Sequence, residues 1–205
     1  PNGVSTSATA PVTVRFTLKD DRGFPLDLKG LYSINTAVQP RFSLSYFTKD
    51  AAGIVGPLIT YTKTASPTMY NPVSANSGTI VENGFGAGDY TYSFPTTSVA
   101  NGNQAVAFDP TKLSETHVVW IQATRQTDLI FQGNANTFYA ANKPYYFVPD
   151  GSSAPLKREI AAQSGCDSCH SKFKAETASS GVFHGGGRVD VNMCNVCHSP
   201  ARTSN

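Results

Sequence analysis

Two short motifs near the end of the sequence contain residue types that could bind a metal or a cofactor. Each has two cysteines three positions apart and a histidine directly after the second; the motifs are Cys166-Asp167-Ser168-Cys169-His170 and Cys194-Asn195-Val196-Cys197-His198. This Cys-x-x-Cys-His pattern is the attachment signal for c-type haem. Each thiol can form a thioether with one haem vinyl group, and the histidine then presents its imidazole to the iron. The sequence therefore predicts two covalently bound c-type haems.

Four cysteines in two pairs could instead bind a zinc ion as four thiolates, or form disulfides. All four lie within the two motifs, and only 4 of the 205 residues are histidine. Two of these four histidines directly follow a cysteine pair, which neither a four-thiolate zinc site nor a disulfide requires. We therefore favour haem over zinc and over disulfides.

The histidines are also the expected axial ligands. Two six-coordinate irons need four axial ligands, and His170 and His198 are expected as the proximal ones. His184 opens the sequence His184-Gly185-Gly186-Gly187-Arg188 between the motifs, where glycines would let the backbone approach a flat macrocycle. We expect His184 to be a distal ligand, with the first haem favoured, and an exposed loop histidine is the alternative. The Arg188 guanidinium would pair with a haem propionate.

His117 is the remaining histidine, and its role stays open at this point. It alternates with Val119 and Ile121 on one face of an expected strand, where a hydrogen-bonded structural histidine is the usual finding. Because no other histidine remains, His117 is also the candidate for the fourth axial position, within the chain or donated to a neighbouring molecule. A ligand from another chain or from a segment outside this sequence is the other alternative. Met69 and Met193 are the only thioether candidates, and Met193 adjoins the second motif too closely to reach that haem.

Residues 1–150 are expected to form an immunoglobulin-like β-sandwich or barrel. Polar residues alternate with β-branched or aromatic ones, which is typical of half-buried strands. Seven strands are expected, at Val12–Lys19, Arg41–Phe47, Leu58–Lys63, Asp89–Phe94, Ala105–Phe108, Thr116–Thr124 and Lys143–Val148. The glycine-rich Gly84–Gly88 is expected to be a turn, because a strand rather than a helix follows it. Tyr90, Tyr92, Phe94 and Trp120 are expected in the core.

Residues 151–205 are expected to form a small haem-organised segment with little regular structure. One short helix is expected, with Ser153 as its N-cap, Pro155 in its first turn and its end near Gly165. The rest is rich in glycine and polar residues and poor in aliphatic ones. Such a segment cannot build a hydrophobic core of its own, so the apolar surface of bound haem would have to organise it.

Composition restricts the partners. The 16 Lys and Arg nearly balance the 14 Asp and Glu, and a net charge of +2 argues against nucleic-acid binding. No run approaches the roughly 18 apolar residues of a membrane-spanning helix, so no transmembrane segment is expected. The chain starts at Pro1 without a leader, which suggests that any targeting segment has been removed. Because c-type haem is attached outside the cytoplasmic membrane, we expect an extracellular or outer-surface protein.

The chain resembles the OmcA/MtrC family of outer-surface multihaem c-type cytochromes. The specific part of the resemblance is the haem segment, at Arg158-Glu159-Ile160, Cys166–His170, His184–Asp190, Cys194–His198 and Ser199-Pro200. Looser likeness is found at Val14–Gly23, Tyr90–Phe94, Thr116–Gln122 and Phe147–Gly151. The resemblance implies a β domain before closely packed bis-histidine haems that pass electrons to extracellular acceptors. Family members usually carry many more haems, and the gap from His170 to His184 is longer than usual, so the chain would be a short member or a fragment.

The expected function is therefore extracellular electron transfer by a di-haem carrier rather than catalysis, with terminal metal reduction left open. Its expected partners are other cytochromes, copies of this chain in a filament or relay, and extracellular electron acceptors. A haem enzyme or small-ligand sensor would follow if one iron lacked its distal ligand. A β-type binding module with a structural zinc site is the third alternative.

Overall fold

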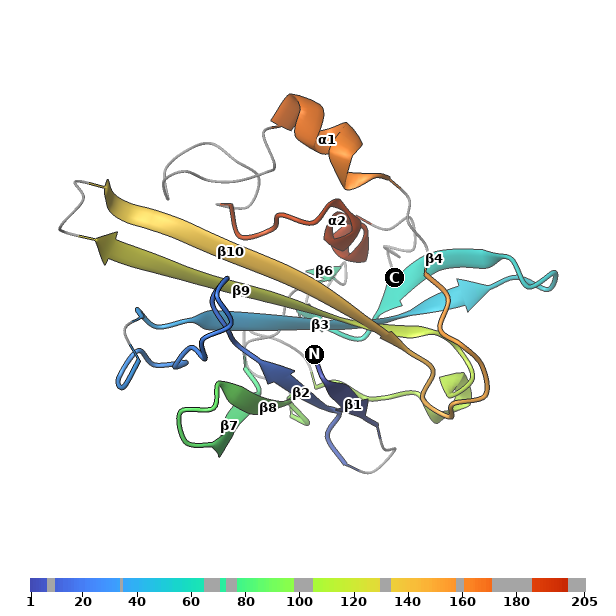
Figure 1. Ribbon diagram of the computed structural model, residues 1–205. Coiled ribbons are helices and arrows are strands. Elements are labelled where there is room, and N and C mark those ends of the chain that lie inside the picture. Colours follow the sequence, from blue (N-terminus) through green and yellow to red (C-terminus); the bar gives the residue numbers. More distant parts are fainter. Residues whose placement is uncertain are drawn as a thin grey trace.

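The computed structural model describes residues 1–6, 10–33, 35–64, 71–72, 77–97, 105–129, 134–157, 161–170 and 186–198. The strands are β1 Gly3–Ser5, β2 Thr13–Thr17, β3 Gln39–Lys49, β4 Val55–Thr60, β5 Lys63–Thr64, β6 Asn71–Pro72, β7 Thr79–Gly84, β8 Asp89–Ser93, β9 His117–Leu129 and β10 Asn134–Phe147. The helices are η1 Pro110–Lys112, a 3-10 helix, and α1 Gln163–His170 and α2 Val191–Cys197. The protein is thus mainly β, as predicted (Figure 1).

Two four-stranded antiparallel sheets form the body of the molecule. Their strand orders are β1-β2-β8-β7 and β10-β9-β3-β4, and β5 pairs with β6 in a separate two-stranded sheet. One core cluster joins the two larger sheets, because Val14 and Tyr92 of the first pack with Phe42 and Val119 of the second. At its centre the Phe42 and Tyr92 rings stack with their centroids 3.9 Å apart. The two sheets therefore enclose a common apolar layer.

The burial pattern follows the sequence alternation. In β2, Val14 and Phe16 are buried while Arg15 is exposed. In β9, His117, Val119 and Ile121 face the layer between the sheets, whereas Val118 and Trp120 face the opposite side and are buried as well. Tyr90, Tyr92 and Phe94 line the core as predicted. Trp120 is also buried, but it belongs to a second cluster on the outer face of the β10-β9-β3-β4 sheet.

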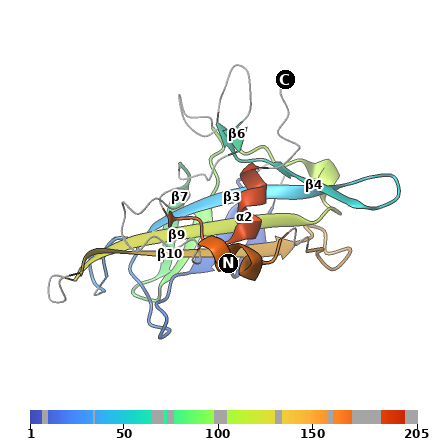
Figure 2. The same cartoon turned by 90° about the horizontal axis from the view of Figure 1, so that it is seen from above.

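Both α-helices lie on this outer face, away from β2 and β8 (Figure 1). Seen from above, α2 crosses over the middle of the sheet and α1 lies beside it (Figure 2). Each helix contains one Cys-x-x-Cys pair, so both cysteine pairs are helical. Within the described residues, no helix is long and apolar enough to cross a membrane.

The position predicted for the short helix was wrong. The described residues 151–157 are not helical, and α1 begins only at Gln163. Pro155 disfavours the helical conformation for Ala154 before it. The Leu156 N–H donates to Thr116 Oγ1 at 3.0 Å, which fixes this connection against the start of β9 instead.

The strand predictions succeeded where a partner strand was available. Six of the seven predicted segments overlap a strand, and Gly84–Gly88 forms the β7–β8 turn, with positive φ angles at Gly86 and Gly88. Ala105–Phe108 is not a strand: the Val106 N–H donates to the Pro95 carbonyl at 2.8 Å, and Phe108 packs into the core. The strands β1 and β7 were not predicted, since both lie at sheet edges and lack a strong apolar alternation.

Candidate functional site

The second motif is carried by a helix anchored on the sheet. Met193 and Val196 of α2 are 3% and 1% exposed and pack into the outer cluster. That cluster is completed by Phe47, Leu58, Val118 and Trp120. Since residues three apart share a helix face, Cys194 and Cys197 lie together on the neighbouring face, where both are half-buried. The sheet therefore orients the cysteine pair through Met193 and Val196, each of which directly precedes one of the two cysteines.

Asn142 of β10 fixes the chain that leads into α2. Its Nδ2 donates to the Gly187 carbonyl at 3.0 Å, and its Oδ1 accepts from the N–H groups of Val189 at 2.8 Å and Asp190 at 3.2 Å. Asp190 then caps the helix, because its carboxylate accepts from the Asn192 N–H at 2.9 Å. One side chain of the sheet thus holds the backbone on both sides of Arg188.

Gly187 allows this segment to approach the sheet closely. A Cβ at this position would lie 2.5 Å from Gln122 Nε2 of β9, and Asn142 is the cross-strand partner of Gln122. The glycines were predicted to make room for a macrocycle. For Gly187 the neighbours on the side where a Cβ would lie are Gln122 and Thr124 of the sheet. His184 and Gly185 lie outside the described residues.

Three of the motif thiols and Arg188 are close enough to influence one another electrostatically. Cys166, Cys194 and Cys197 are free thiols. Burial raises the pKa of the Cys194 and Cys197 thiols, while the positive charge of Arg188 acts in the opposite direction on both. The thiol of Cys166 is also close enough to interact electrostatically with Cys194. Neutral thiols are poor nucleophiles, so the second pair does not have the character of an activated cysteine.

The histidines of the two motifs are less fully described. His198 ends α2 as its C-cap, with its N–H donating to the Cys194 carbonyl at 2.8 Å, and it is exposed. For Cys169 and His170 the structure describes only the helical backbone of α1, and their side chains lie outside the description. The structure therefore places five of the predicted site residues in this region: Cys166, Cys194, Cys197, Arg188 and His198.

His117 lies elsewhere, inside the sandwich. It is 0% exposed, and the rings of Tyr46, Tyr61, Phe108 and Phe147 surround it. The Glu115 carbonyl, 2.8 Å from Nδ1, can only accept, so Nδ1 carries the proton. Nε2 then accepts from the Tyr61 hydroxyl at 3.2 Å. Both ring nitrogens are engaged, which supports the structural role that the sequence left open; ligation would require His117 to leave the core.

The donor set at α2 fits covalent haem attachment. Two thiols lie on one side of a short helix, an exposed imidazole follows directly, and a guanidinium lies near both thiols. In the same cluster, the buried Trp120 Nε1 has no hydrogen-bond partner among the described residues, so it is a donor that a bound group could use. Among side chains that the structure describes, no three of His, Cys, Asp or Glu converge as a metal site.

Asn142 and Gln122 were not identified from the sequence. Each is a single polar residue in a β-strand, and its partner lies some tens of residues away in the chain. No local spacing signals such a contact.

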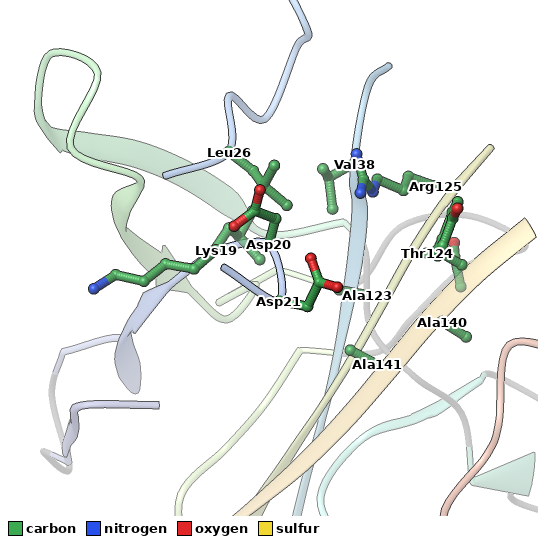
Figure 3. Close-up of a pocket in the computed structure, with 12 residues that line it drawn as sticks. Lys19, Asp20, Asp21, Leu26, Val38, Ala123, Thr124, Arg125, Ala140 and Ala141 are labelled. Carbon is green, nitrogen blue, oxygen red and sulfur yellow. The ribbon is translucent and has the colours of Figure 1, made fainter. Parts of the chain in front are cut away.

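A hollow also lies beside the β9–β10 ribbon (Figure 3). It has a volume of about 450 Å³ and lies between the loop after β2 and the β9–β10 ribbon. Leu18, Leu26 and Val38 form its apolar part, and the Arg125 guanidinium lies 5.0 Å from the centre of the Tyr139 ring at its edge. None of the predicted site residues lines it.

Comparison with known proteins finds no family model, no curated protein and no solved structure that matches this chain.

The Asn142 contacts predict a local loss of order. Replacing Asn142 with Ala removes three hydrogen bonds to residues 187–190 and should destabilise this segment by about 1–3 kcal/mol. Hydrogen exchange of the Val189 and Asp190 amides should accelerate, while exchange in β2 and β8 stays unchanged. Asn83→Ala, at an exposed position of β7, is the matched control. Unchanged protection of both amides in Asn142→Ala would contradict this assignment.

The environment of His117 predicts a pH-dependent stability. Burial lowers its pKa below the usual value of about 6.5, and the charges of Glu115 and Asp109 only partly oppose this. Below pH ~6.5 the unfolded chain therefore binds more protons than the folded one, so the free energy of unfolding should fall as the pH drops from 7 to 5.

His117→Phe should remove this part of the pH dependence, although the variant is less stable at every pH because Tyr61 loses its partner. Urea denaturation of both proteins at a series of pH values measures the difference. Equal slopes in the two proteins would show that His117 does not titrate as described.

Proposed function

We propose that this protein is an electron carrier that binds two c-type haems, one through Cys166 and Cys169 and one through Cys194 and Cys197. The observation that carries the proposal is the assembly around α2, where a Cys-x-x-Cys pair, the following exposed histidine and Arg188 are held on the sheet. Bound haem would supply reversible one-electron chemistry at its iron.

The chain's own residues would attach, orient and partly shield these groups. His170 and His198 would be the proximal ligands and His184 a distal ligand. Arg188, near both thiols of the second motif, would pair with a propionate. Met193 is buried beneath α2 and cannot serve as a ligand without leaving the cluster, so the methionine ligation that raises haem potentials is not available from it. With a histidine at every axial position, low potentials and a carrier rather than an enzyme would follow.

The architecture supports a finer proposal, that the β domain is immunoglobulin-like. In such domains, strands A, B, E and D form one sheet and strands G, F and C the other. The orders β1-β2-β8-β7 and β10-β9-β3-β4 correspond to this arrangement, with β4 as an additional C′ strand. Residues 1–150 would then be the scaffold and residues 151–205 the haem segment.

The cellular setting is part of the same proposal. Haem attachment outside the cytoplasmic membrane and the resemblance to the OmcA/MtrC family support an extracellular or outer-surface location. Other cytochromes, copies of this chain and extracellular acceptors would be its partners, in a relay or filament.

One observation favours a second candidate, a haem protein with one open iron site. The chain has four histidines, and His117 is buried with both ring nitrogens hydrogen-bonded. Three histidines then remain for four axial positions. The fourth position would be taken by a residue of a partner molecule or by a small ligand, and the second case would give a sensor or enzyme.

Haem stoichiometry tests the main proposal. The purified chain, expressed with export and c-type maturation, should carry two haems that survive denaturation, measured by mass spectrometry and pyridine haemochrome absorption. Cys166→Ala/Cys169→Ala and Cys194→Ala/Cys197→Ala should each retain one haem, and Asn195→Ala, between the cysteines of the second motif, should retain both. A colourless wild-type chain at the polypeptide mass of 21.8 kDa would exclude it, and zinc in that chain would support the binding-module alternative.

Ligand binding distinguishes the two candidates. If this chain does not itself provide the fourth axial ligand, the monomeric ferric protein should contain one low-spin and one high-spin haem in electron paramagnetic resonance. Added imidazole should convert the second to low spin. Two low-spin haems in a monomer, with or without imidazole, would exclude the open site.

A further inference from the structure

A hydrogen bond that the Gln163 side chain accepts joins the two helices that carry the motifs. Gln163 is the first residue of α1, and its Oε1 accepts from the Val191 N–H, at the first residue of α2, at 2.8 Å. The first N–H groups of a helix have no partner within the helix. The Asp190 cap takes the Asn192 N–H, so Gln163 provides the acceptor that the cap of α2 leaves unfilled.

This contact has the same position relative to both motifs. Gln163 precedes Cys166 by three residues, and Val191 precedes Cys194 by three residues. Residues three apart lie on the same side of a helix. A bond between Gln163 and Val191 therefore brings Cys166 and Cys194 closer together. The electrostatic interaction between the Cys166 and Cys194 thiols agrees with this geometry.

The other contacts described above are made by α2 or by the segment that leads into it. Met193 and Val196 hold α2 on the sheet, and Asn142 holds the segment before it. Among the described α1 residues, none belongs to the outer cluster. The Gln163 bond is therefore a contact through which the position of α2 can fix that of the first motif.

We propose that Gln163 is a positioning residue that sets the spacing between the two Cys-x-x-Cys-His helices. This inference rests on the proposed function in one respect, that the groups carried by the helices are haems. The spacing of the helices then sets the distance between the two haems, and electron transfer between them weakens steeply as that distance grows.

The first test uses the haem-free full chain and reads helix spacing directly. In a Cys169→Ala/Cys197→Ala background, a short bifunctional thiol reagent should join Cys166 to Cys194. Gln163→Leu, which has a similar size but no acceptor, should slow this reaction about fivefold, because one hydrogen bond contributes about 1 kcal/mol. Gln163→Glu keeps an acceptor oxygen and should restore the rate, and Gln39→Leu, at an exposed position of β3, should leave it unchanged.

A second readout uses the haem-loaded protein. The magnetic interaction between the two irons, measured by electron paramagnetic resonance, should weaken in Gln163→Leu and recover in Gln163→Glu. Equal cross-linking rates in Gln163→Leu and the wild type would overturn the inference, and two retained haems in that case would leave the proposed function intact. A slower Gln163→Leu reaction in a chain that never acquires haem would uphold the helix spacing while the proposed function fails.

Discussion

The first part of β9, residues 117–122, is buried on both of its faces, and the remaining structure depends on this. It lies between β10 and β3, so its backbone is paired on both edges. Val119 and Ile121 contribute to the layer between the sheets, and Val118 and Trp120 form the surface on which α2 rests. A polar substitution on the outer face would remove the support of α2 without touching the sandwich core. The same strand therefore stabilises the scaffold and positions the site.

The segment that carries the two Cys-x-x-Cys-His motifs uses this surface because it has few apolar residues of its own. Met193 and Val196 are the buried residues of α2, and each contributes roughly 1.5–3 kcal/mol by burial. Directed hydrogen bonds, which the side-chain oxygens of Asn142, Gln163 and Asp190 accept from backbone N–H groups, supply the orientation that so small a contact cannot. Two covalently attached haems would add the large apolar surface that the segment lacks, which is the physical reason for linking this architecture to this cofactor.

Much of this arrangement could be predicted from local sequence patterns, and the rest depended on distant contacts. Alternation predicted β2, β3 and β8, and the Cys-x-x-Cys-His spacing identified the candidate site without any structure. The helix predicted from Ser153 was wrong because the local sequence does not reveal the contact between Leu156 and Thr116, 40 residues apart. The role of His117 needed the ring positions of Tyr61 and Phe108, which no spacing in the sequence encodes. The Gln163 contact was missed for the same reason.

The central claim, that two redox-active haems are held on the outer face of the sheet, is tested most directly by a spectroelectrochemical titration of the purified full chain. The account predicts that each chain takes up two electrons reversibly, at low potential, with the absorption changes of c-type haem. Uptake of no electrons, or of electrons without a haem spectrum, would contradict it.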